Sequence, residues 1–131
     1  MGTVPLLQDE EVSAEALAVF DEIRAARGTD YVNNFWRALA HDPALLRATW
    51  DRLRTVMAPG ALDPLVKEML YIAVSTANGC SYCVHSHTAA AKTKGMTPDM
   101  HGELLAVIGM AAQTNALVTG LQTPVDEAFS V

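Results

Sequence analysis

Two cysteines and a histidine close together are the side chains of this chain with the clearest chemical potential. Cys80 and Cys83 form a Cys-x-x-Cys pair, and His87 follows four residues later. A thiol attacks as its thiolate, and an ordinary cysteine has a pKa of about 8.5. The unpaired N–H groups of a helix's first turn favour such an anion, and a nearby imidazole can accept the thiol proton. The residue types therefore predict a redox-active dithiol site.

Helical geometry selects which histidine belongs to this site. A helix that begins near Cys80 turns by about 100° per residue, so Cys80, Cys83 and His87 share one face. His85 points the other way, and the spacing therefore favours His87 as the functional histidine. If one sulfur is oxidised to sulfenic acid, the second sulfur, one turn away, can condense with it to a disulfide.

Glu68 is a charged residue in an otherwise apolar segment. In the helix predicted there it shares one side with Tyr71 and Ser75. A carboxylate in such a segment either lies on a solvated stripe or faces a site. If Glu68 faces the cysteines, it could hold His87 in one tautomer or relay a proton through water.

The elements that position these residues are all predicted to be helices. Capping residues followed by proline or an apolar pattern mark the starts, and glycines or Pro59-Gly60 mark the ends. No segment shows the alternation of β-branched and polar residues that is typical of strands. The chain is thus predicted to be a single all-α domain over residues 1–131, with about six to seven helices. The predicted helices span residues 14–27, 34–40, 43–58, 64–78, 80–94 and 98–118.

Composition narrows the classes of partner. The net charge of the 131 residues is -6, and without a Lys/Arg run nucleic acid is not expected to bind. Hydrophobic residues make up 50% of the chain and the mean hydropathy is +0.16, so we expect a homo-oligomer that covers the apolar excess. No basic segment precedes an apolar one at the start, and no apolar run approaches the roughly 20 residues of a membrane span. These features predict a cytoplasmic protein with no membrane partner.

The spacing of the site residues resembles a known family signature. Glu68, eleven intervening residues and then Cys80-x-x-Cys83-x-x-x-His87 resemble the motif of the AhpD-like alkylhydroperoxidases, within the carboxymuconolactone decarboxylase superfamily. Residues 31–43 and 115–126 resemble the family's flanking segments, so the resemblance covers roughly residues 30–126. It implies an all-helical fold, a homotrimer or hexamer, and reduction of hydroperoxides without a bound cofactor or metal.

The resemblance also implies a role for each site residue. Cys83 would be the peroxidatic cysteine, and Cys80 the resolving one that takes electrons from an external dithiol, a lipoylated protein in the best-known members. Glu68 and His87 would form a proton relay. The chain departs from those members at Tyr82, where they carry a further relay histidine.

Three other readings of the same residues remain open. A cofactor-free decarboxylase or isomerase of the wider superfamily would use Glu68 or His87 as acid/base and would not need the sulfurs. A non-enzymatic oligomeric redox sensor or binding module would use the disulfide to change packing. A zinc site would need both cysteines, His87 and a fourth ligand, either Glu68 or His85.

Overall fold

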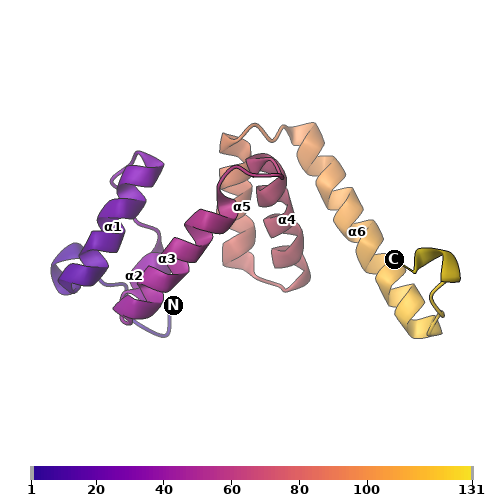
Figure 1. Ribbon diagram of the computed structural model, residues 1–131, viewed down its shortest axis with the longest axis horizontal. Helices are drawn as coiled ribbons and strands as arrows, with labels where there is room; N and C mark the ends of the chain where they lie inside the picture. The colour runs from indigo at the N-terminus through magenta and orange to yellow at the C-terminus, as the bar shows by residue number, and fades with distance from the viewer. Residues whose placement is uncertain (1, 131) are drawn as a thin grey trace. The chain divides into compact units, whose positions relative to one another are not determined.

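The computed structural model describes residues 2–130 as six α-helices and two short 3-10 helices, with no strand in that range (Figure 1). The all-helical fold class predicted from the sequence is confirmed. The chain divides into two compact units, residues 1–58 and 59–131. The span of one domain over residues 1–131 stays a prediction.

The first unit packs three α-helices around an apolar core. Helix α1 packs against α3, and α2 also contacts α3. At the centre the rings of Trp36 and Trp50 meet edge to face with their centroids 5.6 Å apart, and Phe20 and Leu46 are fully buried beside them. Such a core supplies most of the driving force for folding. The elements of this unit are η1 (Asp9–Glu11), α1 (Ala14–Arg27), α2 (Asn34–Leu39) and α3 (Pro43–Met57).

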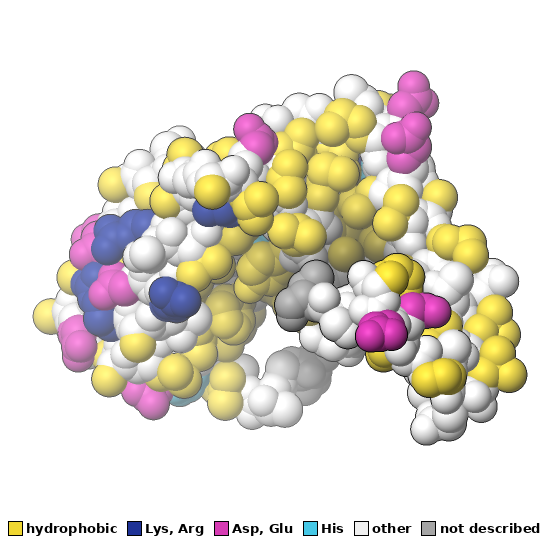
Figure 2. Space-filling view, turned by 45° about the vertical axis from the view of Figure 1, so that its right-hand side comes forward, with side chains coloured by type: hydrophobic (Ala, Val, Ile, Leu, Met, Phe, Trp, Pro, Cys, Tyr) yellow, Lys and Arg dark blue, Asp and Glu magenta, His cyan; other side chains and the backbone are white. Residues whose placement is uncertain are grey.

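Ion pairs fasten the N-terminal segment of the first unit to its helices. The Arg24 guanidinium lies 2.7 Å from the Asp9 carboxylate, and Arg37 donates to the Leu7 carbonyl at 2.9 Å. Acidic and basic side chains lie together on this unit in Figure 2. Arg37 also pairs with Asp9, so one carboxylate joins two arginines.

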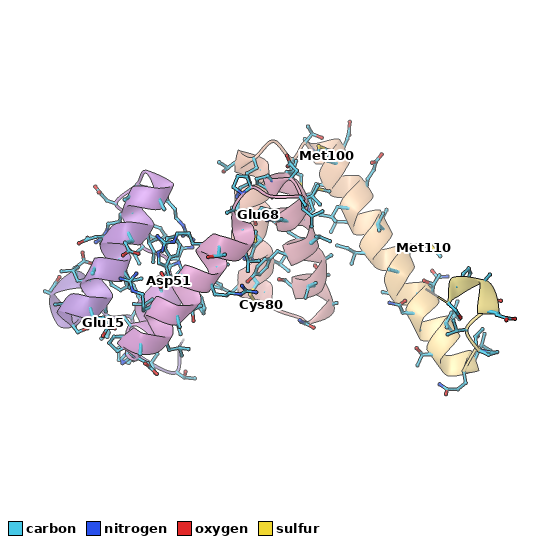
Figure 3. The ribbon with its side chains drawn as sticks, viewed as in Figure 1. Glu15, Asp51, Glu68, Cys80, Met100 and Met110 are labelled. Carbon is cyan, nitrogen blue, oxygen red and sulfur yellow. A yellow bond between two sulfur atoms is a disulfide. The ribbon has the colours of Figure 1, made fainter. Side chains whose placement is uncertain are left out.

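The second unit is built on a helical hairpin. Helices α4 and α5 pack along each other, and α6 packs against α4 (Figure 1). Buried Ile72 from α4, Ala91 from α5 and Leu104 from α6 form the core with Met96, and Leu65, Met69, Met100 and Ile108 pack around them. Figure 3 shows Glu68 and Cys80 in this hairpin. The elements are α4 (Pro64–Ala77), α5 (Ser81–Thr93), α6 (Pro98–Leu121) and η2 (Glu127–Phe129).

Four of the helix starts predicted from the sequence are confirmed by side-chain oxygen caps. Each capping side chain accepts a backbone N–H from the first turn of its helix, which satisfies a donor that has no partner within the helix. The last long helix runs to Leu121, three residues beyond the predicted end. The four capping residues are Ser13, Asp42, Asp63 and Thr97.

Helix α6 corrects one prediction. Its 24 residues have a mean hydropathy of 1.6 over an 18-residue window, so by length and composition alone it could cross a membrane. The expectation that no apolar run approaches about 20 residues is therefore wrong here. Gln113, Thr114 and Asn115 interrupt the run in the sequence, but the surrounding residues keep the average high. Large apolar side chains are exposed along this helix (Figure 2), namely Leu105, Val107, Met110, Leu117, Val118 and Leu121.

A left-handed glycine forms the turn between α4 and α5. Gly79 has φ 71°, a conformation that costs other L-residues about 1–2 kcal/mol. The following N–H, from Cys80, returns to the Ser75 carbonyl at 2.9 Å and closes the end of α4. Cys80 is at the same time the N-cap of α5. The glycine therefore delivers the first cysteine directly to a helix N-terminus.

We expect Gly79→Ala to lower the free energy of unfolding by about 1 kcal/mol. No atom lies within 4 Å of the added methyl group, so the cost comes from the backbone conformation alone. Gly79→Asn is the matched control, because asparagine tolerates this conformation better and should lose less. Urea denaturation of the three proteins measures the differences. Equal stability of all three would contradict this account of the turn.

Candidate functional site

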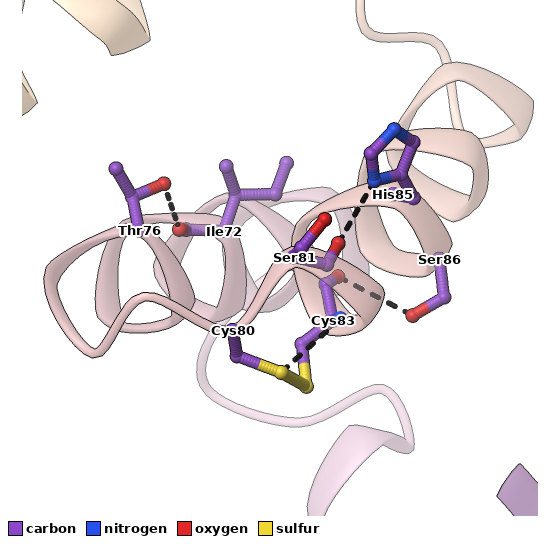
Figure 4. The surroundings of a disulfide bond; sticks show 7 residues. All are labelled: Ile72, Thr76, Cys80, Ser81, Cys83, His85 and Ser86. Atoms are coloured by element: carbon purple, nitrogen blue, oxygen red, sulfur yellow. Dashed lines mark hydrogen bonds between the residues drawn. A yellow bond between two sulfur atoms is a disulfide. The ribbon is translucent and has the colours of Figure 1, made fainter. Parts of the chain in front are cut away.

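The two cysteines are joined in a disulfide at the start of α5 (Figure 4). Their Cα atoms lie 5.3 Å apart, within the usual range for a disulfide. The prediction that this i, i+3 pair can close a disulfide is confirmed. Both residues are half-buried, so the bond lies at the edge of the packed hairpin.

The N-terminus of α5 interacts directly with the Cys80 sulfur. As the N-cap residue, Cys80 accepts the backbone N–H of Cys83 on its Sγ at 3.3 Å. An N–H directed at a sulfur, together with the positive end of the helix dipole, stabilises negative charge there. In the reduced protein we therefore expect the N-terminus of α5 to favour the thiolate form of Cys80.

Glu68 lies beside His87, as the sequence suggested it could. The Oε2 atom of Glu68 is 2.7 Å from Nδ1 of His87. The Glu68 side chain is only 5% exposed and that of His87 is 18% exposed. Glu68 is therefore buried against His87 of α5, and the alternative of a solvated stripe is wrong.

A third residue completes this cluster. Nζ of Lys94, the C-cap residue of α5, donates to the second oxygen of Glu68 at 2.8 Å. Both carboxylate oxygens of Glu68 therefore have a nitrogen partner from α5. The sequence held a signal for this contact, because Lys94 follows His87 by seven residues, or two helical turns.

These contacts control the charge of Glu68. Burial alone would raise the pKa of its carboxyl group, but the hydrogen bonds from His87 and Lys94 and the charges of those groups outweigh it. The pKa of Glu68 is consequently below its ordinary value of 4.5, and the group is ionised at neutral pH. An ionised carboxylate only accepts hydrogen bonds, so Nδ1 of His87 must carry the hydrogen. In neutral His87 the proton-accepting nitrogen is then Nε2.

Tyr71 holds the same imidazole from its face. The two rings are stacked with centroids 3.6 Å apart and planes inclined by 20°. Tyr71 comes one turn after Glu68 on α4, so a single helix contacts both the edge and the face of His87. The sequence placed Tyr71 on the correct side of α4 but did not indicate this stacking.

The site has two parts, the disulfide and the cluster of Glu68, His87 and Lys94. Both lie along the face of α5 that was predicted from the sequence. Within residues 2–130 no hydrogen bond joins Glu68 or His87 to either sulfur. His85 is exposed, and its Nδ1 lies 2.9 Å from the Ser81 carbonyl (Figure 4). In the same part of the chain no group of three or more His, Cys, Asp or Glu side chains is placed to hold a metal ion.

Comparison with known proteins identifies the family. The model of the carboxymuconolactone decarboxylase family matches residues 43–124, which include the whole site. The chain belongs to this family and is an AhpD-like member of it.

Individual relatives agree with this assignment. The crystal structure of the alkylhydroperoxidase AhpD core from Rhodospirillum rubrum has a TM-score of 0.95 and 67% sequence identity, over 100% of this chain and 98% of that one. The alkyl hydroperoxide reductase AhpD of Mycobacteroides abscessus is 28% identical over 122 residues, 86% of this chain and 70% of the relative. Uncharacterized protein 4 in the cox locus of Paracoccus denitrificans is 30% identical over 63 residues, 48% of this chain and 54% of that protein.

We expect Glu68→Gln to lower the free energy of unfolding by about 1–2 kcal/mol at pH 7, because two charge-assisted hydrogen bonds are weakened. A carboxyl group whose pKa is lower in the folded than in the unfolded state stabilises the protein at pH values above its unfolded-state pKa. This stabilisation is lost as the pH falls through the folded-state pKa. The difference between the parent and Glu68→Gln should therefore be constant above about pH 6 and shrink below pH 4.5.

Urea denaturation at pH 7 and pH 4 measures this difference. Glu15→Gln, which changes an exposed carboxylate on α1, is the control and should change stability by less than about 0.5 kcal/mol. A Glu68→Gln effect that is equal at both pH values would show that ionisation of Glu68 does not stabilise the fold.

Proposed function

We propose that this protein is a thiol-dependent peroxidase, a disulfide oxidoreductase that reduces hydroperoxides through Cys80 and Cys83. The observation that carries the proposal is the disulfide at the N-terminus of α5, on the same helix as an imidazole whose Nδ1 is bound to a buried carboxylate. The names of the Rhodospirillum and Mycobacteroides relatives support the same class of reaction.

The proposed oxidation moves one proton in each of its two steps. Cys83 transfers its proton to Nε2 of His87, and the thiolate attacks one oxygen of the hydroperoxide. The O–O bond breaks, Cys83 becomes a sulfenic acid, and the departing alkoxide takes the proton and leaves as an alcohol. Cys80 then attacks the sulfenic sulfur, which closes the disulfide and releases water. Glu68 holds His87 in the tautomer that this transfer requires.

An external dithiol completes the proposed cycle. A dithiol of the lipoyl type, carried on a partner protein, attacks Cys80 and supplies the two electrons and two protons that reopen the disulfide. The reaction as written needs no resident metal or organic cofactor. Tyr82 replaces the further histidine of the best-known members, and in the proposed reaction His87, oriented by Glu68, carries the proton without a second histidine.

We also propose that the protein is a cytoplasmic homo-oligomer, a trimer or hexamer. The exposed apolar side chains of α6 support this proposal, because a soluble protein covers a patch of that kind with a partner. The polar residues Gln113 and Asn115, two positions apart near the middle of α6, would be costly in lipid. We therefore favour a protein interface over a membrane span for this helix.

The peroxidase proposal predicts rapid loss of two thiols per chain when the reduced protein meets one equivalent of hydrogen peroxide. Thiol titration over time measures the loss. Cys83→Ser should react slowly, because it lacks the thiol that attacks the peroxide in the proposed first step. His87→Asn should slow the reaction about 100-fold by removing the proton acceptor, whereas His85→Asn, on the exposed side of the same helix, should leave the rate unchanged.

Other outcomes would favour the other functions. Thiols that persist for hours in the parent protein would refute the peroxidase proposal. Lyase or isomerase activity that survives Cys80→Ser/Cys83→Ser would indicate an acid/base enzyme of the wider family. A change of assembly on oxidation without multiple turnovers would indicate a redox sensor.

The oligomer proposal predicts a mass well above that of the 14.0 kDa chain in light scattering after size-exclusion chromatography. Val107→Glu should reduce the assembled fraction, because it buries a charge in the proposed interface. Glu15→Lys on α1 should leave the assembly unchanged. A monomeric parent, or one that sediments with lipid vesicles, would contradict the proposal.

A further inference from the structure

Lys94 has no role in the reaction proposed above, although it contacts Glu68 directly. Its Nζ lies 2.8 Å from Oε1 of Glu68, while the other oxygen of the carboxylate is bound to His87. The Lys94 side chain is 38% exposed, whereas the Glu68 side chain is 5% exposed. The ammonium group therefore connects the buried carboxylate to the surface of the hairpin.

Without Lys94, Glu68 would keep a single hydrogen-bond donor from α5. Burial favours the neutral form of a carboxyl group, and here it acts to raise the pKa of Glu68 against the hydrogen bonds and the Lys94 charge. A protonated Glu68 can donate its own hydrogen to Nδ1. Nε2 of a neutral His87 would then carry the ring proton and could not accept another. The ionisation of Glu68 thus decides which nitrogen of His87 is basic.

We propose that Lys94 is a positioning residue that acts through Glu68: it keeps the carboxylate ionised and oriented, and so holds His87 in the tautomer with the hydrogen on Nδ1. The effect on catalysis depends on the proposed peroxidase function, but the effect on the tautomer does not. Lys94 contacts neither sulfur in any described hydrogen bond or ion pair. Its influence on the cysteines passes through Glu68 and His87.

The chain offers well-matched variants for the test. Lys94→Gln removes the charge, and Lys94→Arg keeps it. Lys92→Gln is the control, because Lys92 is an exposed residue of the same last turn of α5. All three changes are at exposed positions and should preserve the fold, which far-UV circular dichroism checks.

The measurement is ¹⁵N NMR of the imidazole nitrogens in the oxidised protein at neutral pH, where the two tautomers have distinct shifts. The chain has four histidines, and the spectrum of His87→Asn assigns the His87 signals. We expect the parent, Lys94→Arg and Lys92→Gln to show hydrogen on Nδ1. Lys94→Gln should shift most of the population to hydrogen on Nε2. An unchanged His87 tautomer in Lys94→Gln would overturn the inference.

The rate of thiol loss with peroxide separates this inference from the proposed function. If both are correct, Lys94→Gln reacts about tenfold more slowly than the parent and Lys94→Arg restores the rate. If the parent does not react but the tautomer changes as expected, the peroxidase proposal fails and the role of Lys94 is supported. If the parent reacts rapidly and Lys94→Gln matches it in both rate and tautomer, the role of Lys94 fails and the peroxidase proposal survives.

Discussion

The buried carboxylate of Glu68 is the constraint on which the arrangement of the second unit depends. A carboxylate taken out of water must receive hydrogen bonds or else become neutral. Helix α5 provides two donors, His87 and Lys94, that lie two turns apart on one face. Because the acceptor is on α4 and both donors are on α5, sliding one helix along the other by a turn would break both contacts. The apolar contacts of Ile72 and Ala91 favour close packing of these helices, but such contacts are non-directional. The polar cluster therefore fixes the register that the apolar core alone leaves open.

Helix α5 also orders the chemistry of the site along its length. Its N-terminus meets Cys80, where unpaired N–H groups and the helix dipole favour negative charge. Its C-terminus carries Lys94, a cation at the end where the dipole favours positive charge. His87 lies between them, held at its edge by Glu68 and on its face by Tyr71. A side chain held at two points loses most of its freedom to rotate, so the contacts from α4 define the position of the imidazole relative to the helix that also carries the sulfurs.

The sequence predicted what local chemistry determines. The helix caps bind backbone groups only two or three residues away, so they can be predicted without knowledge of the fold. These caps are Ser13, Asp42, Asp63 and Thr97. Helical periodicity likewise placed His87 on the face of the cysteines. The partner of Lys94 was not predicted, since periodicity gives its face but not the residue of α4 opposite it. The role of Glu68 was open for the same reason, and a contact between helices decides it. The division into two units and the exposed apolar surface of α6 depend on packing that no single segment encodes.

The ionised state of Glu68 also limits how protons can move in the proposed reaction. Both of its oxygens are occupied by donors, so it does not store a proton at neutral pH. In this cluster the proton is then carried by the imidazole of His87, whose Nε2 atom is not engaged by these contacts. One carrier is sufficient, because each proposed step moves a single proton from a thiol to a leaving oxygen: first to the alkoxide of the peroxide, then to the hydroxide of the sulfenic acid. Between the steps His87 returns to its neutral form, ready to accept the proton of Cys80. A second relay histidine is therefore not required by the stoichiometry. Tyr82 is compatible with a relay in which Glu68 orients the base and His87 alone carries the proton.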